Sequence, residues 1–106
     1  MTEAFEVRYT EGAREDLLRL FDFLLDRAQT AEDFDDAKGA VDALRTAAEG
    51  HLGRTPFIYR KAGTSPFIRE LVIPFRAAGY VALYEIEGTS VVNVLAVRHQ
   101  REDDYF

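Results

Sequence analysis

Cysteine and tryptophan are absent from this chain of 106 residues. Without cysteine it can form no disulfide, no thiol nucleophile and no cysteine-ligated zinc site. Its two histidines are His51, expected to have a structural role beside a helix end, and His99. A metal site would therefore depend mainly on carboxylates. We expect no metal, no cofactor and a reducing compartment, the cytoplasm.

Long apolar runs and common catalytic motifs are lacking as well. The chain begins MTEAFE, with two carboxylates and no apolar segment, so no signal peptide is expected. No apolar stretch approaches the roughly 20 residues that a membrane-spanning helix requires, so no membrane partner is expected. Neither a glycine-rich phosphate-binding loop nor a Gly-x-Ser-x-Gly motif occurs.

Positive charge is in short supply, because the formal net charge is −6. A protein that binds nucleic acid without specificity is normally basic, so the overall balance argues against that function. Acids predominate between residues 11 and 36, and bases predominate between residues 54 and 76. The pattern fits either a local basic surface or two ordinary solvated faces.

The residues that are present predict one folded domain, residues 1–106. The hydrophobic fraction of 47% is ordinary for a globular protein, and one core usually takes about 100–200 residues. Phe5, Val7 and Tyr9 alternate with charged residues, which predicts a half-buried strand. Thr10 is then expected to cap a helix over about residues 11–27, which carries a broad apolar face.

A second helix is predicted to begin at a capping box formed by Thr30 and Asp33. Apolar residues follow at steps of three and four up to residue 48, and Gly50 and Gly53 are the expected stop residues. The narrow apolar seam suits packing against the first helix in an antiparallel hairpin.

Three strands are predicted after a connecting loop over residues 52–66. They cover residues 68–73, ended by Pro74, then 80–86 and 91–97, and their short connections imply an antiparallel meander. The order is strand, helix, helix, strand, strand, strand. A helical hairpin on one face of an antiparallel sheet is the natural α+β arrangement for this order.

Titratable and aromatic residues gather directly after the last predicted strand, in the segment RHQREDDYF. Arginine binds phosphate through a planar fork, histidine titrates near neutral pH, and tyrosine stacks on nucleic-acid bases. A polar, frayed C-terminus would show the same composition. Upstream, Arg69 has a structural alternative to a functional role, a surface ion pair with the adjacent Glu70. Tyr80 and Tyr84 share one strand face and are expected in the core.

Two segments resemble the RelE/ParE superfamily of toxins from type II toxin–antitoxin systems. FIRELVIPFRAAGYVALYEIEG (residues 67–88) is similar to the family's Arg-Glu-Leu strand, glycine-tyrosine turn and following tyrosine, here Tyr84. VVNVLAVRHQREDDYF (residues 91–106) is similar to its last strand and His-x-Arg tail. The order of elements is similar too, so the resemblance covers nearly the whole chain.

This resemblance implies a RelE/ParE-like toxin of a plasmid stabilisation-type module, neutralised by a cognate antitoxin in a hetero-oligomer. The antitoxin's C-terminal segment is expected to be disordered until it binds. The acidic helices suggest basic residues on that partner.

Two modes of poisoning are well known in the superfamily. RelE-like members cleave messenger RNA on the ribosome, whereas ParE-like members poison DNA gyrase. In RelE-like nucleases an arginine commonly follows the glycine-tyrosine pair, and lysines occupy the preceding strand. Here Val81 follows Gly79-Tyr80, and the preceding strand reads LVIP. Because loss of one electrostatic donor costs roughly 3 kcal/mol of barrier, we favour gyrase as the target and no enzymatic activity.

The candidate site residues follow from the same resemblance. For a nuclease they are Arg76, Arg98, Arg101 and Tyr105, with His99 as the base. For a gyrase poison, the three arginines and Tyr105 are expected to bind the target. A third alternative is an interaction module that binds an antitoxin but has lost toxicity, which the sequence does not separate from an active toxin.

Overall fold

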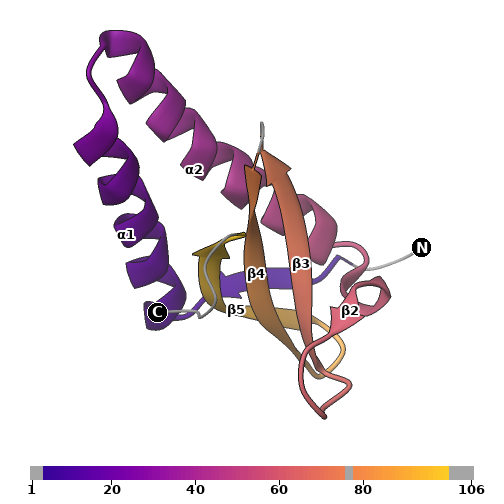
Figure 1. The fold of residues 1–106 in the computed structure, drawn as a ribbon. Coiled ribbons are helices and arrows are strands. Elements are labelled where there is room, and N and C mark those ends of the chain that lie inside the picture. Colours follow the sequence, from indigo (N-terminus) through magenta and orange to yellow (C-terminus); the bar gives the residue numbers. More distant parts are fainter. Residues whose placement is uncertain (1–3, 76–77, 101–106) are drawn as a thin grey trace.

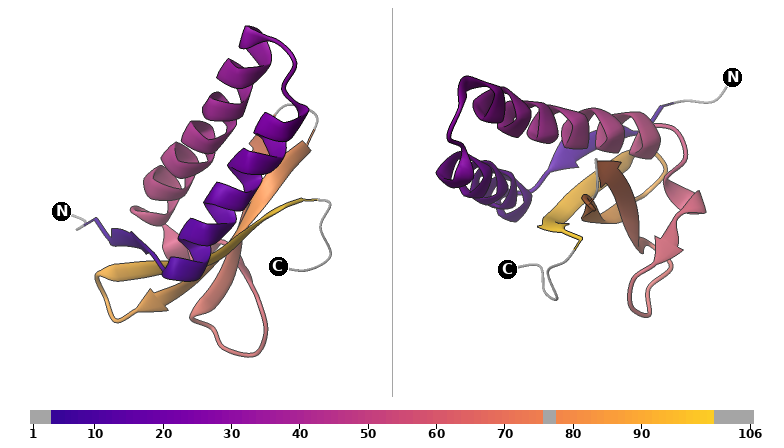
Figure 2. Two further views of the ribbon diagram at one scale, coloured as in Figure 1. Left: turned by 90° about the vertical axis from the view of Figure 1, so that its left-hand side faces the viewer. Right: turned by 45° about the horizontal axis from the view of Figure 1, so that its top comes forward.

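The computed structural model describes residues 4–75 and 78–100. Five strands form one mixed sheet in the order β1-β5-β4-β3-β2, and two helices cover one of its faces (Figures 1 and 2). This confirms the α+β class, the helical hairpin and the antiparallel meander. The elements are β1 (Glu6–Tyr9), α1 (Glu11–Arg27), α2 (Ala31–Leu52), a 3-10 turn (Pro56–Ile58), β2 (Arg60–Lys61), β3 (Ile68–Phe75), β4 (Ala78–Glu87) and β5 (Val91–His99).

Both helices begin at the predicted caps. The Thr10 hydroxyl accepts a hydrogen bond from the backbone N–H of Ala13, and Thr30 and Asp33 form the reciprocal capping box. Of the two expected stop residues, Gly53 is confirmed as the C-cap of α2, whereas the helix continues through Gly50 to Leu52. The extra turn buries Leu52 completely. That burial outweighs the roughly 1 kcal/mol cost of a glycine inside a helix.

The strands extend beyond their predicted limits. β3 runs through Pro74, which was expected to end it. Pro74 lies opposite Gly79 and beyond the end of β2, so its missing N–H falls at the open edge of the sheet. Only glycine fits opposite it, because a Cβ atom on Gly79 would lie 2.6 Å from the carbonyl oxygen of Ile73.

Two features of the sheet were not predicted. β1 pairs in parallel with β5, so the first and last strands of the chain lie side by side. β2 is a two-residue strand on β3, in a segment that was expected to be loop. β5 itself continues to His99, so Arg98 and His99 belong to a strand and not to a tail.

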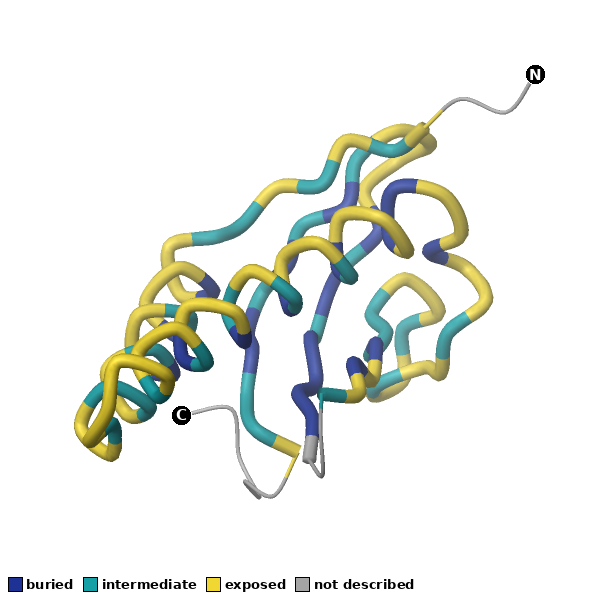
Figure 3. Tube along the Cα trace, turned by 90° about the horizontal axis from the view of Figure 1, so that it is seen from above, coloured by how far each residue is buried: buried dark blue, intermediate teal, exposed yellow. Residues whose placement is uncertain are grey.

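The core lies between the helices and the sheet. Figure 3 shows the buried stretches of the strands behind helices whose outward turns are exposed. Tyr80 and Tyr84 are both buried in this core, as predicted. Its other buried members are Ala13, Leu20, Ala40, Leu44, Ala48, Leu52, Leu71, Ile73, Ala82, Ile86, Val92, Val94 and Val97.

Side chains of α1 bind the part of β5 that β1 does not reach. β1 ends at Tyr9, opposite Val94. Beyond that point the Asp16 carboxylate accepts a hydrogen bond of 2.8 Å from the backbone N–H of Val97. The Arg19 guanidinium donates to the carbonyl oxygen of Val97 at 3.3 Å. These bonds replace a strand neighbour and fix α1 on the sheet.

Asp16→Ala is expected to lower the free energy of unfolding by about 2 kcal/mol, because the buried N–H of Val97 loses its acceptor. Asp16→Asn keeps an oxygen in place and should cost less than about 1 kcal/mol. Urea denaturation measures both losses. The control is Glu15→Ala, which removes an exposed neighbouring carboxylate. Equal losses for Asp16→Ala and Glu15→Ala would contradict this role for Asp16.

Candidate functional site

Two of the predicted site residues, Arg98 and His99, lie in the described part of the chain. Arg76, Arg101 and Tyr105 lie outside the described residues. Arg98 is the cross-strand partner of Val81, and His99 is the partner of Tyr80. Successive strand residues point to opposite faces of a sheet. The structure therefore does not join Arg98 and His99 in one site: His99 lies on the helix-covered face with Tyr80, and Arg98 on the other.

Arg98 stands beside an apolar neighbour. Its guanidinium Nη1 donates to the carbonyl oxygens of His99, at 3.2 Å, and Gln100, at 3.4 Å. Val81 beside it is only 1% exposed. A RelE-like nuclease commonly has an arginine directly after the glycine-tyrosine pair. In this chain a buried aliphatic side chain occupies that position.

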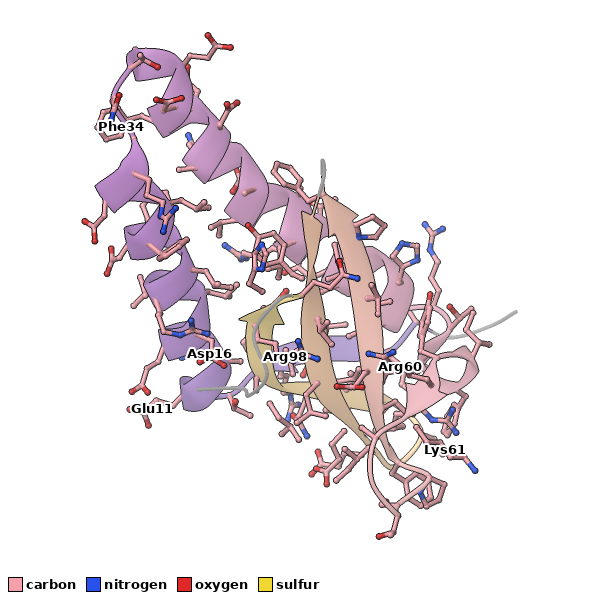
Figure 4. The ribbon with its side chains drawn as sticks, viewed as in Figure 1. Glu11, Asp16, Phe34, Arg60, Lys61 and Arg98 are labelled. Atoms are coloured by element: carbon pink, nitrogen blue, oxygen red, sulfur yellow. The ribbon has the colours of Figure 1, made fainter. Side chains whose placement is uncertain are left out.

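Within residues 54–75, Arg60 and Arg69 are engaged in separate contacts within the chain. Arg60 and Lys61 lie at the β2 edge of the sheet (Figure 4), and the Arg60 Nε atom is 3.0 Å from a carboxylate oxygen of Glu70. The predicted ion pair between Arg69 and Glu70 was therefore wrong. Adjacent strand residues face opposite ways, whereas Arg60 is directly opposite Glu70 in the ladder.

Arg69 instead holds the loop before β3. Its guanidinium donates to the carbonyl oxygens of Phe57, Tyr59 and Pro66 at 2.9, 2.7 and 2.9 Å. Its cross-strand partner Tyr84 donates its phenol hydrogen to the carbonyl oxygen of Pro56 at 2.5 Å. Burial raises the pKa of Tyr84 well above its ordinary value, so the phenol remains a donor.

A groove lies between the helices and the C-terminal end of β5. It consists of two adjoining hollows of about 380 and 520 Å³, which share Leu24, Arg27, Tyr80 and His99. We call it the Tyr80 groove. The rings of Tyr80 and His99 meet edge to face, with centroids 5.6 Å apart. Burial raises the pKa of Tyr80, so its phenol stays neutral.

Charge is unevenly distributed along the Tyr80 groove. The larger hollow is bordered by Arg19 and Arg27 on α1. The smaller hollow is bordered by Asp33 and Asp36 at the start of α2, and by Arg27 where the hollows meet. Arg27, like the apolar Leu24 and Tyr80, thus borders both hollows, whereas the two carboxylates border only the smaller one.

A separate hollow, of about 540 Å³, lies on the helical hairpin itself. It is lined by Tyr9, Arg14, Leu17, Leu18, Phe21, Lys38, Val41, Asp42 and Arg45. Burial and the nearby Glu49 carboxylate raise the pKa of Tyr9 to about 12.

In residues 4–75 and 78–100, no helix is long and apolar enough to cross a membrane.

Comparison of the chain with known proteins identifies its family. The family model described as the ParE toxin of the type II toxin–antitoxin system parDE matches residues 7–104. The chain belongs to the ParE toxin family. "Toxin RelE3" of Caulobacter vibrioides is 36% identical over 90 residues, which cover 85% of this chain and 88% of that protein.

The fold of this ParE-family toxin also matches a solved structure. The "Chromosomal ParDE TA system from P. aeruginosa" superimposes with a TM-score of 0.66. The match covers 93% of this chain and 97% of the other at 16% identity, so it supports the fold alone. The RelE/ParE assignment is confirmed, and membership in a toxin–antitoxin family implies an antitoxin as partner.

Sequence reasoning missed the polar residues of this ParE-family toxin that join elements or border the groove. Asp16 was visible as a carboxylate in the buried stripe of α1 that contains Ala13 and Leu20. The groove too could have been expected from the sequence, because α1 has more apolar residues than one buried helix face can hold. Phe23, which is 51% exposed, lines the larger hollow.

Proposed function

We propose that this toxin arrests growth by acting on DNA gyrase in the bacterial cytoplasm, without cleaving nucleic acid, and that it belongs to a plasmid stabilisation-type module. The observation that carries this proposal is Val81, a buried aliphatic side chain at the position where a RelE-like nuclease commonly has an arginine. The preceding strand contains no lysine, and its Leu71 and Ile73 are buried in the core.

Cleavage of RNA requires cations near the phosphate on which negative charge develops. On the sheet face opposite the helices, Arg60 is paired with Glu70 and Arg98 bonds the carbonyl oxygens of its own segment. A missing donor costs roughly 3 kcal/mol of transition-state stabilisation. Because these guanidinium groups are engaged within the chain, their contacts argue against a catalytic role in RNA cleavage.

The proposed target-binding residues are Arg98, Arg101, Tyr105 and Arg76. Arg98 lies at the end of β5, where the rigid sheet supports it, and its planar fork suits a carboxylate or phosphate on the target. Arg101 and Tyr105 follow within a few residues in the sequence.

Expression of the chain without its antitoxin is expected to arrest growth, and co-expression of the antitoxin should restore it. Purified toxin should inhibit supercoiling by gyrase and leave messenger RNA on translating ribosomes intact. Arg98→Ala should weaken inhibition of gyrase by about tenfold, because a charge-assisted contact is lost. Arg8→Ala, which removes an exposed arginine from β1, is the matched control and should have no effect.

Other results would support the alternatives. Cuts within codons on translating ribosomes, lost in His99→Ala, would establish the RelE-like endoribonuclease. Tight binding of the antitoxin with no growth arrest would establish a non-toxic antitoxin-binding module.

A further inference from the structure

We propose that the chain forms a symmetric homodimer in which the helical hairpins of two copies pack face to face. The two-fold axis crosses α1 at Leu18 and α2 at Ala40, so each helix runs antiparallel to its counterpart in the partner subunit. A second copy of the chain is then the occupant of the hollow on the hairpin. This inference concerns an assembly of the toxin with itself and does not depend on the proposed target.

The outer face of the hairpin has an apolar centre. Leu17, Phe21 and Val41 line the hollow and are only partly buried. Leu18 lines it as well and is 63% exposed. Removal of apolar surface from water is favourable, so a partner that covers this centre gains free energy before any charge is considered.

Six exposed charges surround the apolar centre in two stripes. They are Arg14 and Asp22 on α1, and Asp35, Lys38, Asp42 and Arg45 on α2. Residues three or four apart lie on the same face of a helix, and both stripes follow this spacing, with Leu18 between the two charges of α1. Arg14, Lys38 and Arg45 line the hollow, so the two stripes belong to one surface.

On α1 the two charges are placed symmetrically about Leu18, with opposite signs. Arg14 precedes Leu18 by four residues, and Asp22 follows it by four. In a two-fold symmetric interface the same patch meets itself, so an axis at Leu18 places Asp22 of one copy against the partner's Arg14. The symmetric contact forms on the other side of the axis. Leu18 meets the partner's Leu18 over the apolar centre.

The same relation holds on α2 about Ala40. Lys38 and Asp42 lie two residues to either side of it, and Asp35 and Arg45 lie five residues to either side. The axis therefore places Lys38 against the partner's Asp42, and Asp35 against the partner's Arg45. Every charge of the stripe meets a charge of the opposite sign.

A single axis crosses both helices at these points, because the two centres lie equally far from the tip of the hairpin. Leu18 lies nine residues before Arg27, the last residue of α1, and Ala40 lies nine residues after Ala31, the first residue of α2. At the rise of an α-helix both are about 14 Å from the tip. Figure 2 shows the two helices side by side and running in opposite directions.

Contacts within one copy do not account for this arrangement. In residues 4–75 and 78–100, Arg14, Asp22 and Asp35 form no ion pair. Arg45 lies 3.8 Å from Glu49 in an exposed contact of a kind that contributes little. Arg14 and Asp22 are two turns apart on one helix, and a second copy brings them together.

The symmetry itself favours a second copy over a different protein. A different partner has no reason to meet charges that repeat with reversed sign about two centres at one level, whereas a two-fold dimer requires that order. None of the residues that line this hollow also lines the described part of the Tyr80 groove. The dimer therefore leaves that groove open.

The test exchanges charges so that two variants repel themselves and attract each other. The acidified variant carries Arg14→Glu with Arg45→Glu, and the basified variant carries Asp22→Lys with Asp35→Lys. In a homodimer of either variant, like charges meet at every exchanged contact. In a one-to-one mixture of the two variants, every introduced charge meets an opposite charge.

Sedimentation velocity of the full chain measures the Kd of the dimer, with one variant labelled by a fluorophore in the mixture. We expect a reversible wild-type dimer and roughly 100-fold weaker dimers of each variant alone. The mixture should return to within about fivefold of wild type. The control is Arg54→Glu with Lys61→Glu, which changes the net charge as much as the acidified variant at exposed residues outside the helices. It should stay within about threefold of wild type.

Leu18→Gln tests the apolar centre without a change of charge. The side chain is exposed in the isolated chain, so the fold should be retained. Dimerisation should weaken about tenfold, because the side chain lies at the centre of the interface. Ile58→Gln, which changes a side chain that is 71% exposed outside the hairpin, should leave the Kd unchanged. If the melting temperature shows that a charge variant does not fold, this pair of variants decides.

Four results would overturn the inference. The first is a wild-type chain that stays monomeric at the highest concentration reached. The second is a wild-type dimer that neither the acidified variant nor Leu18→Gln weakens, which would place the interface elsewhere. The third is a pair of weakened variants that do not associate with each other, which would show that the charges do not pair about this axis. The fourth is a monomeric wild type whose affinity for the antitoxin falls in the acidified variant, which would identify the antitoxin as the occupant.

Discussion

Tyr84→Ala is expected to lower the free energy of unfolding by about 4 kcal/mol, which is a large part of the stability of a domain of this size. Tyr84 is fully buried, so its removal leaves a cavity in the middle of the sheet. The substitution also removes the phenol that donates to the carbonyl oxygen of Pro56. Urea denaturation followed by circular dichroism measures the loss.

Tyr84→Phe separates the hydrogen bond from the packing. It fills the same space and should cost about 1–2 kcal/mol, because the carbonyl oxygen of Pro56 loses its buried donor. Tyr9→Phe is the matched control, because the half-buried Tyr9 makes a long hydrogen bond of 3.3 Å from its phenol to Glu49. It should cost less than about 0.5 kcal/mol. A Tyr84→Phe protein as stable as wild type would show that the bond to Pro56 contributes nothing.

Arg69→Ala is expected to cost about 3 kcal/mol, the second-largest effect. Three carbonyl oxygens lose a charged donor at once, and hydrogen bonds to a charged group contribute about 1.5–3 kcal/mol each before compensation by water. Arg69→Lys keeps the charge but lacks the planar fork, so most of the loss should remain. Thermal or urea unfolding of the two variants provides the comparison.

The control for Arg69 is Arg8→Ala, which breaks an ion pair with Glu6 that is exposed on both sides. Such pairs contribute about 0–1 kcal/mol, so this variant should be nearly as stable as wild type. Equal losses for Arg8→Ala and Arg69→Ala would contradict the role of Arg69 in holding the loop. That loop exposes Phe57, Ile58 and Phe67.

Local signals were sufficient for the helices. Thr10 and Thr30 cap groups within three residues of themselves, so their role depends on nothing distant. The glycine-tyrosine pair, by contrast, lies within β4 and not in a turn, because β4 begins at Ala78. Strand limits were less certain, because Pro74 breaks a strand only where its N–H is needed, and the neighbouring strand decides that.

The candidate site was only partly predictable. Arg98 and His99 are neighbours in sequence, and only the continuation of β5 to His99 shows that they face opposite ways. His99 then joins Tyr80 in the groove, and Arg98 stands beside Val81. For Val81 the sequence was the better guide. Its apolar character was evident from the sequence, and the structure explains that character by showing that the side chain is buried.

The sequence by itself determined the α+β class, the two capped helices, the meander and the family. These depend on hydrophobic periodicity, on capping residues and on short sequence motifs in a fixed order. Tertiary structure alone decided the parallel pairing of β1 with β5, the bond from Asp16 to Val97, and the carbonyl oxygens that Arg69 binds. The physical reason is that hydrogen-bonding groups accept any geometrically suitable partner. The partner that each group finds is set by how elements distant in the sequence pack around one core. The uneven charge of the Tyr80 groove arises in the same way, from residues of α1, α2 and β5.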